Sequence, residues 1–240
     1  MSEVNDVVTA VKRRRTVRAG FRAVAADAET IRQVIEAGLL APSAKNSQPW
    51  RLHVVSDQSL LERLAALVRA GGQLDEYVPH DPRTGKPHSY KSTVEGSAAI
   101  LESVSFAVLV ENVGPFSGGP EVIRAASPEA LASSLFGYGE EWFGIGACVQ
   151  NMWLTAVSLG LAAAFLADVA IAEAEWRAVL GFEGELVGAL AVGFSDDVPG
   201  PKCDAPFSPG LSRAVWHGPS GQPQAGPAQT RSASSSAAGA

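Results

Sequence analysis

Residues 142–167 constrain the fold of this chain most, because they include no charged residue and are long enough to span a bilayer. A membrane span would poorly tolerate the helix-weakening and polar residues that interrupt this stretch, namely Gly144, Gly146, Gln150, Asn151, Thr155, Ser158 and Gly160. The pattern predicts instead a buried helix that ends near Gly160 and is followed by a buried strand. We therefore expect a globular core and no membrane partner.

The bulk properties indicate one globular domain with a tail. Of 240 residues, 46% are hydrophobic and 18% charged, which is ordinary for a folded protein. Residues 218–240 are mostly Gly, Pro, Gln, Ser and Ala with little apolar bulk, so we expect a domain over 1–217 and a disordered tail. The charge of -6 argues against a nucleic-acid binder, whose affinity depends on a dense basic surface. Acids near the N-terminus do not suit a secretory signal, which predicts a cytoplasmic location.

Helices and strands intermingle along the chain without the regular alternation of a doubly wound sheet, which favours an α+β fold. Helices are expected to begin at residues 5 or 6, at 27 or 30, and at 127, with others over 59–69, 94–101 and 173–180. Buried strands are expected over 52–56, 105–110, 163–167 and 186–194. Residues 73–90 are polar and rich in turn formers, which predicts an exposed excursion of the kind that often forms a lid or ligand loop.

Residues 41–50 form the most informative short stretch, between a helical pattern and a strand pattern. Ser43, Asn46 and Gln48 offer short donors and acceptors for a flat polar molecule, and Pro42 and Pro49 restrict the backbone. From these residues alone, a plain helix-to-strand connection is an equally good interpretation.

Signatures of side-chain catalysis are missing from the sequence. It has no dinucleotide fingerprint, phosphate loop, metalloprotease motif or nucleophile elbow, and its histidines form no metal-ligand pair. His53, within a strand pattern, is expected to be structural, and Cys148 to be a buried thiol. We therefore predict no metal site and no catalytic side chain, and we expect the reactive atoms of any enzyme activity to belong to a bound cofactor.

Three motifs in one order resemble the FMN-dependent nitroreductase family. They are Arg14-Arg15-Thr16-Val17-Arg18 with Phe21, residues 41–50, and Val149-Gln150-Asn151-Met152-Trp153-Leu154 with Ser158-Leu159-Gly160-Leu161. The resemblance covers roughly residues 5–216. It implies a nitroreductase-like α+β fold with a central, mainly antiparallel sheet flanked by helices, and a homodimer that binds two FMN molecules at its interface.

The same resemblance implies a set of cofactor-binding residues. In the first motif, Arg14, Arg15 and Thr16 match FMN-binding positions, and Arg18 matches a cation near the pyrimidine end of the flavin. A loop that reaches the partner subunit's FMN is implied at Pro42, Ser43, Ala44, Asn46 and Gln48. A strand that offers main-chain donors near flavin N5 is implied at Phe165, Leu166 and Ala167. A phosphate-binding cation is implied at Lys202. The sequence departs from the family at Asp204, where a second cation is often found, and at Ala44, where many members have serine.

The implied activity is ping-pong hydride transfer, in which NADH or NADPH reduces the flavin at N5 and a nitroaromatic, quinone or other conjugated acceptor reoxidises it. The small-molecule acceptor's pocket is expected to be walled by residues 73–91 and by Phe136, Tyr138, Trp142 and Phe143, for which ordinary loop and core roles are equally good interpretations. Two alternatives stay open: a flavin-dependent dehydrogenase or oxidase of an amino-acid-derived or peptide substrate, and a non-catalytic flavin-binding protein.

Overall fold

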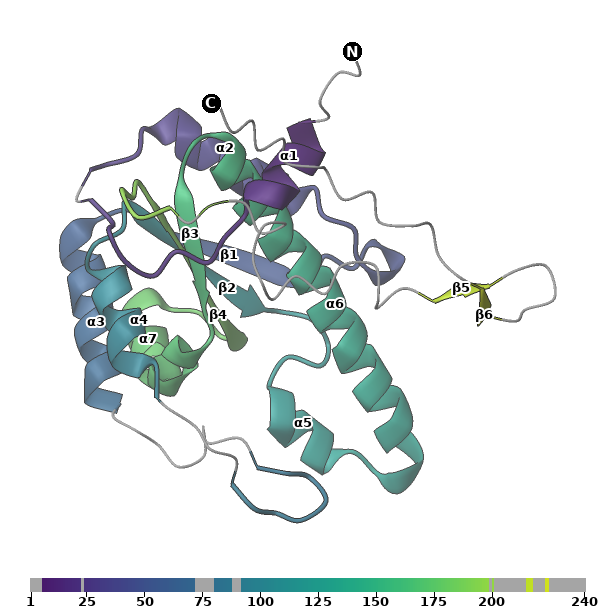
Figure 1. Ribbon diagram of the computed structural model, residues 1–240. Helices are drawn as coiled ribbons and strands as arrows, with labels where there is room; N and C mark the ends of the chain where they lie inside the picture. The colour runs from purple at the N-terminus through teal and green to yellow at the C-terminus, as the bar shows by residue number, and fades with distance from the viewer. Residues whose placement is uncertain are drawn as a thin grey trace. The chain divides into compact units, whose positions relative to one another are not determined.

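The computed structural model describes residues 6–22, 24–71, 80–87, 92–198, 200, 215–217 and 223–224 (Figure 1). The chain divides into two compact units, Met1–Pro199 and Gly200–Ala240. In the second unit, β5 (Trp216–His217) pairs antiparallel with β6 (Pro223–Gln224). The domain boundary expected at residue 217 and the disordered tail stay predictions, since apart from 223–224 the tail lies outside the described residues.

The first unit is built on a four-stranded sheet in which each described pair of neighbouring strands is antiparallel. The strand order is β1-β2-β4-β3, which places β2 and β4 in the centre and β3 at an edge. These strands are β1 (Trp50–Val55), β2 (Phe106–Asn112), β3 (Ala162–Leu166) and β4 (Glu185–Gly193). Every residue of β2 is buried, as expected for a strand covered on both faces.

Helices cover both faces of this sheet. Figure 1 shows α3, α4 and α7 together on one side and α2 and α6 on the other, and two separate hydrophobic clusters fill the two interfaces. The helices of this unit are α1 (Asp6–Arg13), α2 (Ala28–Leu39), α3 (Gln58–Gly71), α4 (Val94–Leu101), α5 (Gly119–Ala125), α6 (Pro128–Ser158) and α7 (Glu173–Leu180). The described part of this unit also has two 3₁₀ turns, η1 (Ala44–Asn46) and η3 (Asp168–Ala172). The predicted α+β fold is confirmed.

Local sequence signals explain where the main helices begin and end. Asp27 caps α2 by accepting the N–H of Thr30 at 2.8 Å, and Ser127 caps α6 by accepting the N–H of Ala130 at 3.3 Å. Gly160 ends α6 with a φ of +79°, a conformation that glycine adopts without strain. The chain then turns directly into β3, as the uncharged stretch predicts.

One difference from the sequence expectation is the length of α6, which runs unbroken for 31 residues from the serine cap through the uncharged segment. Its glycines do not break it, because two of them let neighbours approach closely. A Cβ on Gly137 would lie 2.2 Å from the Phe116 ring, and one on Gly144 would lie 3.2 Å from Ser43 Cβ. Packing therefore overrides the low helix propensity of glycine.

None of the helices in the described part of the chain is long and apolar enough to cross a membrane. Of the predicted excursion, residues 80–87 are described and form a turn in which the Asp81 carboxylate accepts the N–H groups of Arg83 and Thr84, both at 2.8 Å. His80 and Pro87 bridge the base of this turn. Residues 73–79 and 88–90 lie outside the described part, so the lid prediction stays a prediction.

Candidate functional site

The loop between α2 and β1 has a backbone fixed by its own hydrogen bonds. Ser43 Oγ accepts the N–H of Gln48 at 2.9 Å, and the Ser43 carbonyl accepts the N–H of Asn46 at 3.0 Å. Lys45, Asn46 and Gln48 have φ values of 52°, 55° and 45°, in the left-handed region that non-glycine residues rarely adopt. Such strained conformations persist only where the surroundings enforce them, and they concentrate at ligand sites.

Buried residues anchor both ends of this loop. Ala41 is 4% exposed and Trp50 is 7% exposed, and both belong to the cluster beneath α6. Gly144 of α6 lies directly against Ser43. The middle of the loop is therefore exposed and held from behind, so its polar groups are accessible to a ligand.

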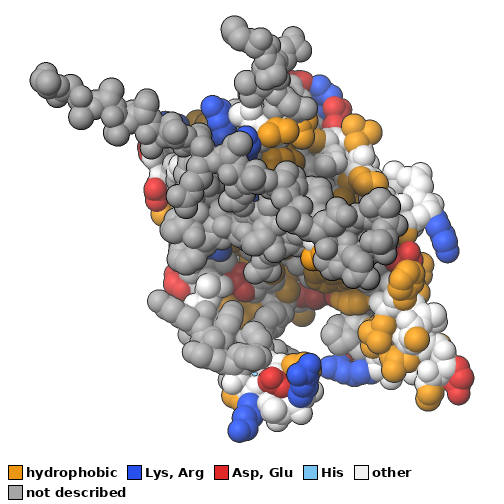
Figure 2. Space-filling view, turned by 45° about the vertical axis from the view of Figure 1, so that its right-hand side comes forward, with side chains coloured by type: hydrophobic (Ala, Val, Ile, Leu, Met, Phe, Trp, Pro, Cys, Tyr) orange, Lys and Arg blue, Asp and Glu red, His pale blue; other side chains and the backbone are white. Residues whose placement is uncertain are grey.

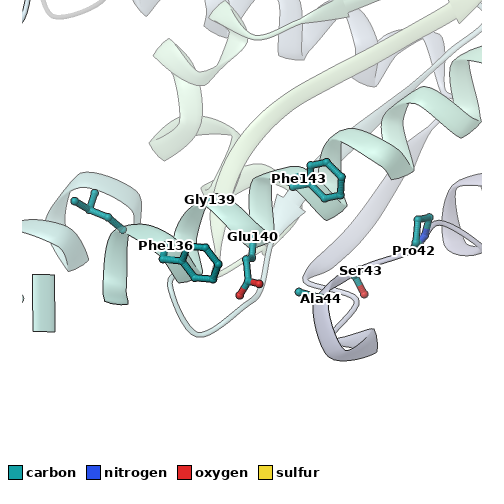
Figure 3. Close-up of a pocket in the computed structure, with 8 residues that line it drawn as sticks. Pro42, Ser43, Ala44, Phe136, Gly139, Glu140 and Phe143 are labelled. Carbon is teal, nitrogen blue, oxygen red and sulfur yellow. The ribbon is translucent and has the colours of Figure 1, made fainter. Parts of the chain in front are cut away.

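A cavity of about 650 Å³ opens between this loop and the first half of α6 (Figure 3). Its lining is mainly apolar, and comprises Pro42, Ser43, Ala44, Leu135, Phe136, Gly139, Glu140 and Phe143. Of the predicted pocket walls, Phe136 and Phe143 line this cavity. Tyr138 and Trp142 instead form an edge-to-face pair with ring centroids 5.9 Å apart, and Tyr138 donates its hydroxyl to Glu185 at 2.5 Å.

The arginine-rich motif lies along the outer edge of β3, the edge that faces away from β4. Thr16 bridges to Ala163 in parallel, and the N–H of Val17 donates to the Ala163 carbonyl at 3.1 Å. The Arg14 guanidinium lies over the Trp153 ring, with 4.8 Å from Cζ to the ring centroid. This contact fixes the first arginine between α1 and α6 while leaving the edge of its guanidinium open to hydrogen bonds.

A second cavity, of about 640 Å³, lies where this motif meets the end of β3. Its lining combines a cation, hydroxyls, one carboxylate and apolar side chains: Arg18, Ser92, Thr93, Gly96, Ser97, Ile100, Phe165, Leu166, Ala167 and Asp168. Neighbouring residues of a strand direct their main-chain groups to opposite edges. The Ala163 carbonyl points to the outer edge of β3, away from β4. The main-chain groups of Phe165 therefore point to the outer edge as well, whereas those of Leu166 face β4.

The structure thus brings the predicted cofactor residues together in two groups. Arg18 and the β3 segment share one cavity, with Arg14, Arg15 and Thr16 adjoining it along the chain, while Pro42, Ser43 and Ala44 line the other. Within the described part of the chain, the two cavities share no lining residue. Asn46 and Gln48 are exposed on the loop and line neither of these cavities. Lys202 lies outside the described residues, as does Asp204.

Sequence reasoning missed a polar cluster at the second cavity. Asp168 accepts hydrogen bonds from Thr93 Oγ1 at 2.6 Å and from Ser97 Oγ at 2.7 Å, which ties the start of α4 to the end of β3. The only sequence signal for it was a pair of hydroxyl residues at the start of a short helix, far along the chain from the acid. It also missed Glu140, which the sequence shows only as one acid before the uncharged stretch.

His53 and Cys148, the other side chains considered for chemistry, have surroundings typical of structural residues. His53 lies 2.8 Å from the buried Glu111 carboxylate, as expected for a structural histidine. Cys148 is buried in the cluster under α6, and burial raises the pKa of its thiol to about 12, so the prediction of an unreactive thiol fits this environment. Among the described residues no group of three or more His, Cys, Asp or Glu side chains is placed to hold a metal ion.

Known proteins share both the sequence pattern and this fold. Residues 11–194 match the model of the nitroreductase family. Nitroreductase NfnB of Mycolicibacterium smegmatis is 28% identical over 202 residues, which cover 78% of this chain and 82% of the relative. A relative from Archaeoglobus fulgidus, named provisionally as an NADH dehydrogenase/NAD(P)H nitroreductase, is 31% identical over 91 residues; these cover 36% of this chain and 52% of that protein, about half its length.

The crystal structure of a nitroreductase with bound FMN from Desulfitobacterium hafniense superimposes with a TM-score of 0.63 at 20% identity, covering 89% of this chain and 99% of that chain. At that identity the likeness shows the fold, and it agrees with the antiparallel sheet between two helical layers. The predicted resemblance is confirmed: this chain belongs to the nitroreductase family.

Proposed function

We propose that the protein is an FMN-dependent oxidoreductase that takes electrons from NADH or NADPH and delivers them to a nitroaromatic, quinone or other conjugated acceptor. The observation that carries this proposal is the cavity in which Arg18 meets the outer edge and end of β3. When bound, FMN would supply the hydride-transfer chemistry between the nicotinamide and the acceptor.

The residues at this cavity fit a flavin. Phe165, Leu166 and Ile100 offer apolar contact to a flat ring, and the outward main-chain groups of Phe165 offer hydrogen bonds to its edge. Arg18 supplies a cation of the kind that stabilises negative charge on a reduced flavin. Of the β3 segment, Phe165 is therefore a better main-chain donor than Leu166.

A second observation of fit is an orphaned donor beside the arginine motif. The Trp153 indole N–H is buried and has no hydrogen-bond partner among the described residues, and its ring lies under Arg14. Buried donors of this kind are rare unless a ligand or partner completes them. Together with Arg14, Arg15 and Thr16 it supports a phosphate or ribityl group on this side of the site, and Lys202 is proposed to add a further cation.

We include a homodimer in the proposal because Pro42, Ser43 and Ala44 of the loop line one cavity of the chain, whereas Arg18 of the arginine motif lines another. A flavin that contacts both groups is most simply held by the arginine motif of one subunit and the loop of the other, including Asn46 and Gln48. An exposed apolar side chain next to the loop supports a protein partner, since Leu40 is 82% exposed. In Figure 2, hydrophobic side chains are exposed near the top and along the right-hand side of the view. A cytoplasmic location is part of the same proposal.

The test is the visible absorption spectrum of the purified protein, followed by anaerobic titration with NADH and with NADPH. We expect flavin bands with roughly one FMN per chain, bleaching by at least one nicotinamide, and a dimer in sedimentation. Protein that is colourless and takes up no added FMN would overturn the proposal. Bound flavin that neither nicotinamide reduces would favour the dehydrogenase or oxidase alternative, and turnover no faster than that of free FMN would favour the non-catalytic one.

A further inference from the structure

The cavity beside the flavin loop has a distinctive charge pattern. Among the described residues that line it, only Glu140 is ionisable, and the others are apolar side chains, glycine and one serine. Figure 3 shows the Glu140 carboxylate between Phe136 and the loop residue Ala44, with Phe143 further along the same helix. The cavity therefore combines exposed aromatic surface with one negative charge.

The Glu140 carboxylate has no hydrogen bond or ion pair with any other described residue, in contrast to its neighbour Glu141. Glu141 is 5% exposed and accepts hydrogen bonds from Asn112 Nδ2 at 2.9 Å and from the N–H of Phe116 at 3.0 Å. Glu141 therefore serves the fold, since it holds the chain after β2 against α6. Glu140 makes no such contribution, and its charge is available to a molecule in the cavity.

We propose that Glu140 determines substrate specificity: this cavity takes the electron acceptor as a flat aromatic molecule, neutral or positively charged, and rejects anionic acceptors. The inference rests on the proposed function, because Pro42, Ser43 and Ala44 are the residues expected to reach the flavin, and they form the wall opposite Glu140. A cation is attracted both by the carboxylate and by the faces of Phe136 and Phe143. An anion meets repulsion in a largely apolar site.

Size and charge favour a small molecule over a second protein copy as the occupant. A volume of about 650 Å³ lies within the usual range for small-molecule sites. A protein surface that sealed the cavity would bury Glu140 without a partner unless it brought its own cation, and burying an unpaired charge is strongly unfavourable. A cationic or neutral acceptor avoids that penalty.

The experiment compares Glu140→Gln with the wild type, using three acceptors that share one nitrobenzyl core: 4-nitrobenzyltrimethylammonium, 4-nitrobenzyl alcohol and 4-nitrobenzylsulfonate. We expect the ratio of kcat/KM for the cation to that for the anion to fall roughly tenfold in the variant, as for loss of one nearby, partly solvated charge. The value for the alcohol should change less than the values for the two charged acceptors. Glu129→Gln is the matched control, since Glu129 lies on the same helix eleven residues earlier, about 16 Å along its axis.

Binding without turnover gives an independent readout. Benzyltrimethylammonium, which carries no nitro group, should perturb the visible spectrum of the oxidised FMN-loaded protein and bind several-fold more weakly to Glu140→Gln, whereas benzylsulfonate should bind more tightly to the variant. The preference should weaken as salt rises.

The outcomes separate the two proposals. FMN content and the rate of flavin reduction by NAD(P)H in the wild type test the proposed function alone, and the control Glu129→Gln should match the wild type in both. A cation-to-anion ratio that does not move while flavin reduction is intact would overturn the role of Glu140. So would a Glu140→Gln variant that alters dimer dissociation but not acceptor preference, because it would place a second copy in the cavity.

Discussion

The carboxylate of Glu111 lies 2.8 Å from Nε2 of His53 on the neighbouring strand, and it is fully buried. The same carboxylate accepts the N–H groups of Gly184 at 2.6 Å and Glu183 at 3.0 Å, so one side chain joins β1, β2 and the turn before β4. Burial by itself raises the pKa of Glu111, but the hydrogen bonds from His53, Gly184 and Glu183 and the charge of Arg51 outweigh it and lower the pKa.

This lowered pKa predicts acid sensitivity. A carboxyl whose pKa is lower in the folded than in the unfolded chain stabilises the fold above its unfolded pKa, about 4.3, and loses that contribution as the pH falls through its folded value. We expect Glu111→Gln to lower the free energy of unfolding at pH 7 by about 1–3 kcal/mol, as for a buried charged hydrogen-bond partner. Urea unfolding between pH 7 and pH 3 should show a shallower acid loss for the variant; parallel curves would contradict the assignment.

The pKa of Glu185 is shifted in the opposite direction, upward. Burial raises its pKa, against the hydrogen bonds that Tyr138 and Asn112 donate to it, so the folded chain retains its proton to a higher pH than the unfolded chain does. Its contribution to stability is fully present below the unfolded pKa and is lost as the pH rises through the folded value. Glu185→Gln should therefore be more stable than the wild type at pH 7, with the difference disappearing below about pH 4. A variant less stable than the wild type at pH 7 would disprove the pKa direction.

Most elements of the fold could be predicted because their signals are local. The helix 94–101 and the helix 173–180 have the predicted bounds, and the caps at Asp27 and Ser127 mark the starts of α2 and α6. Strand order and the unbroken length of α6 could not be predicted, because both depend on contacts between residues far apart in the chain. The contact of Gly137 with Phe116 is an example.

The candidate site likewise has one part that the sequence predicts and another that only the structure shows. The loop residues 42–48 and the arginine motif stand out as short motifs, and family resemblance assigned them to one ligand. Asp168 with Thr93 and Ser97, and Glu140 opposite Ala44, become visible only when α4, α6 and β3 are placed in space. No spacing rule connects those residues in the sequence.

The turn before β4 offers a steric test of the fold. A Cβ on Gly184 would lie 2.1 Å from the main-chain oxygen of Asn112. Asn112 belongs to β2, which is held between β1 and β4 and has no room to move. We expect Gly184→Ala to lower the free energy of unfolding by about 3 kcal/mol or more, in the range of severe overpacking. Gly181→Ala is the control: that site has φ +74° and open space, so only the left-handed strain of about 1–2 kcal/mol should appear. Equal losses by thermal denaturation would contradict the clash.

The position of Arg14 over Trp153 makes the arginine motif testable apart from turnover. Arg14→Ala should weaken FMN retention by about 1–3 kcal/mol, as for loss of a charged hydrogen-bond partner, or roughly 5- to 150-fold in Kd. Arg14→Lys keeps the positive charge but loses the forked guanidinium, so its FMN Kd should lie between those of the wild type and Arg14→Ala. Arg13→Ala, in the adjacent and exposed position, is the control and should bind FMN like the wild type. Because Arg14 also packs on an aromatic ring, the unfolding free energy of each FMN-free variant must be measured beside the FMN Kd from flavin fluorescence. If Arg14→Ala loses stability but binds FMN unchanged, the arginine only supports α6 and does not belong to the cofactor site.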